Sequence, residues 1–186
     1  MRTFIAIELS REIKETLSGI QDELKKAGAD VKWVKTDNIH LTLKFLGEVR
    51  EEKIPKIAQS LKESTNLTAP FDIQLDTAGV FPDLKFPRVV WIGIEEGKEK
   101  LIGLANQIED MLVSLKFPKE KRGFSAHITI GRVRSAKNKD ALIQKLKQVK
   151  PLKLTQQIKS IALFKSTLTP EGPAYEKLAE SSFTKI

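Results

Sequence analysis

The only two histidines of the chain stand in matching tetrapeptides. His40 opens the tetrapeptide HLTL, and His127 opens the tetrapeptide HITI 87 positions later. In each, a threonine follows the histidine by two residues, Thr42 in the first and Thr129 in the second, and the remaining positions are apolar. An imidazole titrates near neutral pH, so one ring can accept a proton while a second, charged ring donates one. Two such rings suit a reaction that needs a base and an acid together.

Hydrolysis of a phosphodiester is a reaction of that kind. The attacking water must lose a proton and the departing alkoxide must gain one, and a positioned base and acid each contribute about 10²- to 10⁴-fold. The threonine hydroxyls can hydrogen-bond the non-bridging oxygens as negative charge develops on them. The spacing does not say which histidine is the acid. The predicted catalytic residues are His40, Thr42, His127 and Thr129.

Both tetrapeptides lie in stretches that are typical of β-strands, NIHLTLKFLG at residues 38–47 and FSAHITIGRV at residues 124–133. Side chains alternate across a strand, so each histidine and its threonine point to one face while the apolar residues point to the other. Each strand therefore has an apolar face for a core and a polar face for a cleft. Two similar lobes related by a pseudo-twofold axis would bring the two polar faces into one cleft.

Two cations stand close to the tetrapeptides. Lys44 has the same strand parity as His40, which would let it reach a substrate phosphate, with a solvated lysine as the alternative. Strict alternation places Arg132 on the face opposite His127, but a bulge at Gly131 would re-aim it toward a phosphate or base. A structural ion pair is the alternative for Arg132. The aromatic residues that could stack on a nucleobase are Trp33, Phe45, Phe81, Trp91 and Tyr175.

The order of predicted elements repeats on either side of the link FPDLKFP at residues 81–87. Each half is predicted as strand, helix, histidine strand, helix and strand, with one more strand at the end. We therefore expect a single bilobal catalytic domain over residues 1–186, with halves of roughly 1–81 and 88–186. The predicted strands are 2–9, 38–47, 71–75, 89–94, 124–133, 158–164 and 174–183, and the predicted helices are 10–28, 54–61, 101–115 and 142–146.

Composition limits the cofactors that the chain can hold. It has no cysteine, which excludes disulfides, thiolate zinc sites and cysteine nucleophiles. With two histidines and no tight cluster of carboxylates, a dedicated metal site is not expected. There is no glycine-rich phosphate loop and no Gly-x-Ser-x-Gly elbow, and a serine nucleophile at Ser125 is a minor alternative. We expect neither a metal nor a cofactor.

Charge and hydropathy indicate the partner and the location. The formal net charge of +8 favours a polyanion such as nucleic acid, with a highly soluble surface as the alternative explanation. No stretch approaches the roughly 18 consecutive apolar residues of a membrane span. The N-terminus turns polar too early for a signal peptide. We therefore expect a cytoplasmic monomer that does not bind membranes.

Longer stretches around the tetrapeptides resemble the 2H phosphoesterase superfamily, and within it the RNA 2′,3′-cyclic phosphodiesterases, which were first named 2′-5′ RNA ligases. The resemblance covers essentially the whole chain and implies an α+β fold with two pseudo-twofold lobes, whose antiparallel sheets line a central cleft with helices outside. The matching stretches are NIHLTLKFLGEV at 38–49, RVVWIGIEEG at 88–97, HITIGRV at 127–133 and LFKSTLTPEGPAYEKL at 163–178.

The resemblance also implies an activity, the hydrolysis of a 2′,3′-cyclic phosphate at an RNA end, or on a nucleoside, to a 2′-phosphate. His40 would protonate the departing 3′ oxygen, His127 would activate water, and the two threonines would hold the phosphate. The sequence departs from many relatives at Ala126, where they have a proline before the second histidine. Proline would stiffen the chain just before the strand, so the backbone around His127 is expected to be slightly less rigid here.

Two other functions stay open. A related enzyme of the superfamily could act on another cyclic nucleotide or join RNA ends by a 2′-5′ linkage. A non-catalytic module could use the same cleft to grip phosphorylated RNA ends. The complete double motif argues against the module, because a protein that only binds has no need of two titrating groups.

Overall fold

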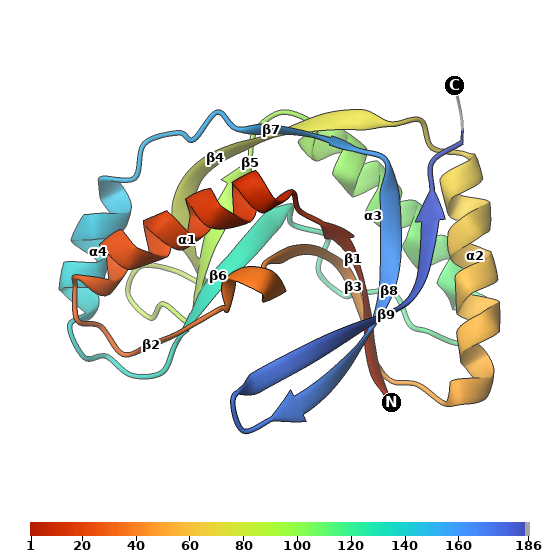
Figure 1. Ribbon diagram of the computed structural model, residues 1–186, viewed down its shortest axis with the longest axis horizontal. Helices are drawn as coiled ribbons and strands as arrows, with labels where there is room; N and C mark the ends of the chain where they lie inside the picture. The colour runs from red at the N-terminus through yellow and green to blue at the C-terminus, as the bar shows by residue number, and fades with distance from the viewer. Residues whose placement is uncertain (185–186) are drawn as a thin grey trace.

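The computed structural model describes residues 1–184 as two antiparallel β-sheets with helices packed outside them (Figure 1). The α+β fold with two antiparallel sheets is therefore confirmed. In sheet order, the first sheet consists of β3 (His40–Glu48), β1 (Arg2–Glu8), β8 (Ser160–Thr169) and β9 (Gly172–Ser182). The second sheet consists of β2 (Val31–Trp33), β6 (His127–Val133), β5 (Val89–Ile94), β4 (Phe71–Phe81) and β7 (Thr155–Ile158).

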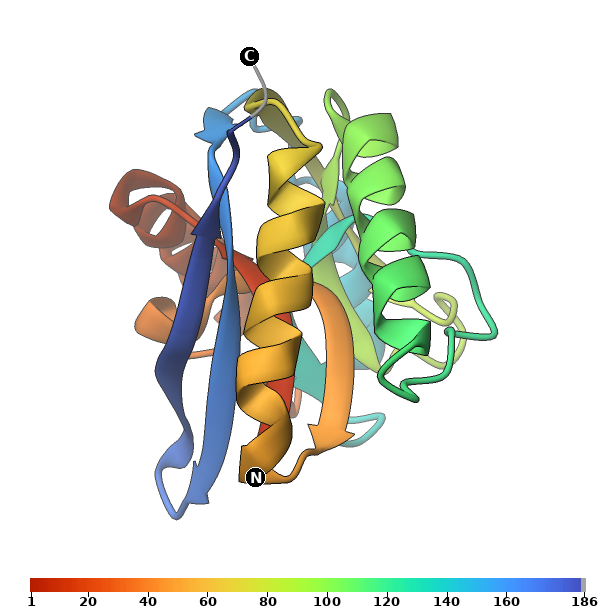
Figure 2. The same cartoon turned by 90° about the vertical axis from the view of Figure 1, so that its right-hand side faces the viewer.

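Helices cover the outer faces of the sheets. Helices α2 and α3 lie side by side on one side of the molecule (Figure 2), and α1 and α4 lie together on the other (Figure 1). Within residues 1–184, no helix is long and apolar enough to cross a membrane. The helices are α1 (Arg11–Lys25), α2 (Ile54–Asn66), α3 (Lys98–Val113) and α4 (Lys139–Lys147), and short 3₁₀ turns are η1 (Thr36–Asn38) and η2 (Glu51–Lys53).

Helix α1 illustrates why the sequence folds locally as expected. The Ser10 hydroxyl accepts a hydrogen bond from the Ile13 amide at 3.3 Å and so satisfies a donor that the first helical turn leaves free. Ile13, Leu17 and Leu24 then recur at helical spacing and are buried. The predicted start of this helix at Ser10 is confirmed.

Each half of the chain contributes two strands to the sheet of the other half, β2 and β4 from the first half and β8 and β9 from the second. Strand β4 comes before the link at residues 81–87, yet it pairs with β5 of the second sheet. Strand β8 comes from the second half of the chain, yet it pairs with β1. The orders β3-β1-β8 and β6-β5-β4 therefore match position by position, as a pseudo-twofold arrangement requires. The predicted halves 1–81 and 88–186 do not coincide with the two sheets, because each half completes the sheet of the other.

Two shorter features differ from the sequence prediction. The strand predicted over residues 158–164 is two strands, because β7 ends at Ile158 in the second sheet and β8 begins at Ser160 in the first. The three-residue strand β2, which extends the second sheet beside β6, was not predicted because it is too short to show a period.

The main core lies between the sheets and the helices and uses the apolar face of both histidine strands. Leu41 on β3 and Ile128 on β6 are fully buried there, as alternation predicts. A second, smaller cluster occupies the opposite face of the first sheet. It contains Phe4, Ala6, Ala162 and Phe164, with Tyr175 packed against it.

Candidate active site

The predicted catalytic residues lie on matching faces of strands β3 and β6, which contact each other where the two sheets meet. His40 and Thr42 pair across the strand with Glu8 and Ala6 of β1 and share one face. His127 and Thr129 pair with Gly93 and Trp91 of β5 in the same manner. Each sheet therefore presents one imidazole and one threonine on the face turned away from its apolar core residues. We call the pair His40 and Thr42 on β3 the first half-site, and the pair His127 and Thr129 on β6 the second half-site.

A β-bulge follows each threonine. In β3, Leu43 has no partner on β1, because Ala6 pairs with Thr42 and Ile5 pairs with Lys44. In β6, Ile130 is the unpaired residue, because Trp91 pairs with Thr129 and Val90 pairs with Gly131. An extra residue shifts the alternation of a strand by one position. Beyond each threonine, the next side chain on the histidine face is therefore five residues after the histidine.

The bulge in β6 aims Arg132 toward the face of His127, as predicted, although the extra residue is Ile130 rather than Gly131. The Ile130 carbonyl at this bulge accepts hydrogen bonds from the Val34 amide at 3.0 Å and from the side chain of Gln21, which is 2% exposed, at 2.8 Å. Gly131 allows β2 to approach, since a Cβ there would lie 2.8 Å from Val31 Cγ1.

The charge of Arg132 acts on groups in both sheets, His127 on β6 and Tyr175 on β9. Burial raises the pKa of the Tyr175 phenol, and the positive charges of Arg132 and Arg2 act against that rise. The Tyr175 ring in turn contacts His40 edge-on. Within residues 1–184, no carboxylate forms an ion pair with Arg132. The described residues therefore do not support a structural ion pair as the role of Arg132.

The prediction for Lys44 is wrong. The bulge at Leu43 turns the lysine away from His40 and into the core, where it is only 4% exposed. Its ammonium group pairs with the Glu109 carboxylate on α3 at 2.5 Å and donates to the Pro118 carbonyl at 3.0 Å. Lys44 therefore ties β3 to α3 and to the loop after it, and it neither faces a substrate nor lies in solvent.

The two imidazoles are held by the same backbone contact. His40 Nδ1 lies 2.7 Å from the carbonyl oxygen of Asn38, and His127 Nδ1 lies 2.7 Å from the carbonyl oxygen of Ser125. A carbonyl oxygen can only accept, so each Nδ1 carries the hydrogen. The Nε2 atom of each ring is thus left free to exchange a proton with a substrate.

Both imidazoles favour the neutral form. Burial lowers the pKa of His40; the Asn38 carbonyl acts against this and the charge of Lys14 adds to it. Burial also lowers the pKa of His127; the Ser125 carbonyl acts against this and the charge of Arg132 adds to it. A neutral ring is ready to act as a base. A bound phosphate anion would favour the charged form of a neighbouring ring and so prepare an acid.

The surroundings of the two rings differ. The ring of His40 stacks on Phe4, with centroids 4.8 Å apart, and meets the edge of Tyr175 at 5.4 Å. The Asn38 side chain donates to the Pro173 carbonyl at 2.7 Å, which fixes the turn of the β8–β9 hairpin beside this half-site. The sequence did not reveal Phe4 or Asn38 as supporting residues, because nothing local marks contacts that span so much of the chain.

The ring of His127 has fewer neighbours. Phe81 meets it edge-on, with centroids 5.0 Å apart, and Phe81 in turn lies 5.0 Å from Trp91. Its hydrogen bond to Ser125 is exposed, whereas the corresponding bond of His40 is partly buried. In residues 1–184, no group of three or more carboxylate and histidine side chains is placed to hold a metal ion.

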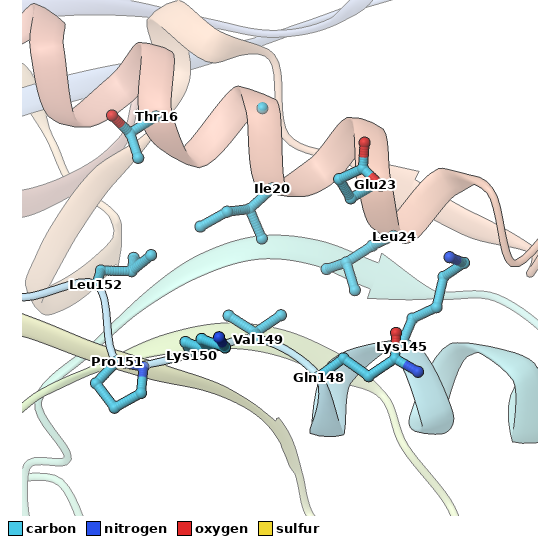
Figure 3. Close-up of a pocket in the computed structure, with 11 residues that line it drawn as sticks. Thr16, Ile20, Glu23, Leu24, Lys145, Gln148, Val149, Lys150, Pro151 and Leu152 are labelled. Atoms are coloured by element: carbon cyan, nitrogen blue, oxygen red, sulfur yellow. The ribbon is translucent and has the colours of Figure 1, made fainter.

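A separate cavity lies away from these residues. It has a volume of about 530 Å³ and opens between α1 and the chain after α4, where Ile20 and Leu24 face Val149 and Leu152 (Figure 3). None of the six predicted site residues lines it. Its walls are mostly apolar, and its titratable side chains, Glu23, Lys145 and Lys150, include neither of the two imidazoles.

Comparison with known proteins gives consistent matches over the whole chain. The family described as LigT like Phosphoesterase matches residues 7–91 and, a second time, residues 92–175, with one histidine tetrapeptide in each match. The chain is 40% identical over 184 residues to the RNA 2′,3′-cyclic phosphodiesterase of Methanocaldococcus jannaschii, covering 97% of this chain and 99% of the relative. It is 35% identical over 176 residues to the RNA 2′,3′-cyclic phosphodiesterase of Methanothermobacter thermautotrophicus, covering 94% and 95%.

Solved structures agree with this result. A protein of Thermus thermophilus superposes with a TM-score of 0.83 at 30% identity and 98% coverage of both chains. E. coli LigT complexed with 3′-AMP superposes with a TM-score of 0.79 at 27% identity, covering 99% of this chain and 98% of LigT.

Proposed function

This chain belongs to the LigT-like phosphoesterase family, and from that premise we propose that it hydrolyses RNA-terminal 2′,3′-cyclic phosphates to 2′-phosphates without a metal ion. The observation that carries the proposal is the matched pair of half-sites on adjacent strands. Each offers a free imidazole Nε2 and a threonine hydroxyl on the same face. One ring can then serve as base and the other as acid on a single phosphate.

The reaction can be written with these groups alone. A water oxygen forms a bond to phosphorus and gives its proton to Nε2 of His127, while the bond from phosphorus to the 3′ oxygen breaks. That oxygen takes the proton of Nε2 of His40, and the phosphate remains on the 2′ oxygen. Burial lowers the pKa of His127, and the charge of Arg132 adds to this, so the ring favours the neutral form that a base requires.

The remaining groups have roles that follow from charge. Thr42, Thr129 and Arg132 would bind the non-bridging oxygens, whose negative charge grows in the transition state. The net charge of +8 would draw RNA ends and nucleoside 2′,3′-cyclic phosphates toward the cleft. We propose that residues 1–186 work as one catalytic domain, because both sheets contribute to the same reaction.

The test is to identify products. The purified protein is incubated with 2′,3′-cyclic AMP, with a cyclic-phosphate-ended oligonucleotide and with 3′,5′-cyclic AMP, each with and without EDTA. We expect 2′-phosphate products from the first two substrates, no product from the third, and no effect of EDTA.

Other outcomes separate the alternatives. Hydrolysis of 3′,5′-cyclic AMP alone would indicate a related enzyme with another substrate. Tight, salt-dependent RNA binding with no product between pH 5 and 9 would indicate a binding module. A rate lost with EDTA and restored by a divalent ion would contradict the metal-free mechanism.

A further inference from the structure

The excess positive charge of the chain comes from one segment. Residues 132–159 hold nine of the 32 lysines and arginines but only one of the 24 acidic residues, Asp140. The other 23 basic and 23 acidic residues cancel, so this segment accounts for the whole formal net charge of +8. We call residues 132–159 the basic segment. Its cations are Arg132, Arg134, Lys137, Lys139, Lys145, Lys147, Lys150, Lys153 and Lys159.

The fold places the basic segment away from α2 and α3. It comprises the end of β6, helix α4 and strand β7, and α4 lies at the end of the molecule opposite to α2 (Figure 1). Seven of its nine cationic side chains are exposed, and Lys139 and Lys145 are partly buried. Within residues 1–184, none of the nine forms an ion pair with a carboxylate, whereas eight of the other lysine and arginine side chains do. This charge is therefore open to a partner.

The basic segment begins at the candidate active site. Arg132, its first residue, lies on the same face of β6 as His127. The Lys139 ammonium group, at the start of α4, donates to the Lys85 carbonyl at 3.0 Å. Lys85 belongs to the link at residues 81–87, whose first ring contacts the His127 ring. A substrate chain that leaves the cleft past His127 would therefore meet α4 next.

We propose that the basic segment binds the phosphate backbone of the RNA chain that precedes the reacting end, on the 5′ side of the terminal nucleotide. This inference rests on the proposed function, because it requires the RNA end to lie between the two half-sites. Lysines and arginines along a surface neutralise phosphates and release the counterions that surround them. The enzyme therefore favours an RNA chain over a mononucleotide through contacts outside the cleft.

The composition of the basic segment favours a nucleic-acid backbone over other anionic partners. The segment has no aromatic residue, and none of its large apolar side chains, all of which the structure describes, is exposed. A membrane-surface helix and the core of a protein interface both use exposed apolar or aromatic side chains. Without aromatic rings the segment has nothing on which bases stack, so its contacts go to phosphates and do not depend on base sequence.

The reach of the basic segment sets the length of RNA that it contacts. The backbone from Arg132 to Lys137 spans at most about 17 Å. Helix α4, with nine residues, is about 14 Å long. Phosphates along one strand advance by about 3.4 Å, so about nine nucleotides cover both stretches. A mononucleotide held at the half-sites is too short to reach the far end of α4.

The experiment compares a substrate with an RNA chain and one without. Steady-state rates are measured at about 0.1 M salt on 2′,3′-cyclic AMP and on an oligonucleotide of about twelve nucleotides that ends in a 2′,3′-cyclic phosphate. The triple variant Lys137→Gln, Lys147→Gln, Lys150→Gln is expected to raise KM for the oligonucleotide about 10- to 100-fold with kcat little changed. Rates on 2′,3′-cyclic AMP should equal those of the wild type, which also shows that the variant is folded.

Salt dependence gives a second measure of the same contacts. In the wild type, KM for the oligonucleotide should rise steeply with salt. The slope of log KM against log salt should be lower by about 2 in the triple variant, since each lost phosphate contact removes about 0.7.

A second triple variant is the matched control. Lys56→Gln, Lys62→Gln, Lys98→Gln lowers the net charge equally, but on α2 and α3 at the other side of the molecule. These three lysines are also exposed, and no ion pair involves them in the described part of the chain. We expect KM for the oligonucleotide to rise no more than about twofold, through the weaker long-range attraction.

Several results would overturn the proposal. Equal rises of KM in the two triple variants would mean that only the net charge matters. Equal rises on 2′,3′-cyclic AMP and on the oligonucleotide would place the effect at the half-sites. An unchanged KM for the oligonucleotide in the first triple variant would refute the RNA contact. Loss of binding to phosphatidylserine vesicles in that variant would then assign the basic segment to a membrane surface.

Failure of the proposed function would look different. A wild type that hydrolyses neither substrate would refute the activity, and the basic segment is then judged by binding of the same oligonucleotide, measured by fluorescence anisotropy. The first triple variant must weaken this binding about 10- to 100-fold and the control variant must not, or the RNA contact is refuted as well.

Discussion

The half-sites around His40 and His127 share a backbone and differ in their surroundings. In both, the imidazole Nδ1 is held by the carbonyl two residues earlier, a threonine follows by two residues, and a bulge comes next. His40 is enclosed by Phe4 and Tyr175, and the β8–β9 hairpin is fixed beside it. His127 meets only Phe81 among the aromatic rings of residues 1–184.

This difference separates two tasks. The features that the half-sites share are those that an acid and a base both need, namely an oriented ring with a free Nε2 and a hydroxyl for the phosphate. The features that differ surround these groups, and they include Arg132 on one strand and Phe45 on the other. We infer that the repeated backbone supplies the chemistry and that the unrepeated side chains choose and orient the substrate.

The largest expected effect tests whether the two rings are equal in the chemistry. His40→Ala and His127→Ala are each expected to lower kcat on a 2′,3′-cyclic nucleotide by about 10²- to 10⁴-fold, because each removes one proton transfer. His40→Ala is also expected to lower the free energy of unfolding by about 1 kcal/mol, and more than His127→Ala, since it removes contacts with both Phe4 and Tyr175 whereas His127→Ala removes one with Phe81. Steady-state kinetics and urea unfolding measure the two effects. Turnover near the wild-type rate in either variant would refute the two-imidazole mechanism.

The next effect concerns Lys44, the residue just after the bulge in β3. Lys44→Ala is expected to lower the free energy of unfolding by about 3 kcal/mol, because it leaves the Glu109 carboxylate, which is 14% exposed, without its cation and with only the Glu120 amide as a partner. The double variant Lys44→Met with Glu109→Leu removes both charges and should unfold near the wild-type urea midpoint. If the double variant were as unstable as Lys44→Ala, the loss would come from packing and not from an unpaired charge.

A smaller effect is expected at Arg132. Arg132→Ala should lower kcat/KM about 10- to 100-fold, as for loss of a hydrogen bond to a charged group, and Arg132→Lys should recover part of it. Lys32, which pairs with Arg132 across β2 and β6, provides the matched control. Lys32→Ala should change kcat/KM far less. The reverse ranking of the two alanine variants would show that Arg132 does not contact the phosphate.

The smallest effect is the pH dependence of stability. Burial lowers the pKa of both histidines below the ordinary value of 6.5, so the unfolded chain takes up their protons first as the pH falls. The histidines' contribution is therefore constant above pH 6.5 and is lost below it, at up to about 1.4 kcal/mol per pH unit for each ring. Urea unfolding of the wild type between pH 7.5 and 5 should show a steeper loss than that of the His40→Ala variant. Equal slopes would mean that folding leaves the pKa of His40 unchanged.

The sequence was sufficient for what depends on strand alternation over a few residues. It predicted the shared faces of His40 with Thr42 and of His127 with Thr129, since these pairs precede the bulges. It also indicated, as one of two interpretations, that a bulge re-aims Arg132, although the extra residue is Ile130 and not Gly131. The bulge in β3 has no glycine to mark it, and for that reason the prediction for Lys44 was wrong.

The pairing of strands that are distant in the sequence could not be predicted from the sequence pattern. The exchange of β4 and β8 between the sheets depends on which strands meet in the folded chain, and each strand alone has the same period wherever it pairs. The support of His40 by Phe4 and the anchoring of the β8–β9 hairpin by Asn38 depend on that pairing as well. These contacts enclose one half-site and leave the other open.

The pH dependence of residual activity in the two histidine variants tests the central claim most directly. In the wild type, kcat/KM should follow a bell with its maximum below pH 6.5, since both pKa values of the free enzyme are lowered. Without His127, the remaining ring must be protonated, so the residual kcat/KM should fall as the pH rises. Without His40, the remaining ring must be neutral, so the residual kcat/KM should rise with pH. Residual activities that change in the same direction in both variants would contradict an acid and a base acting across one cleft.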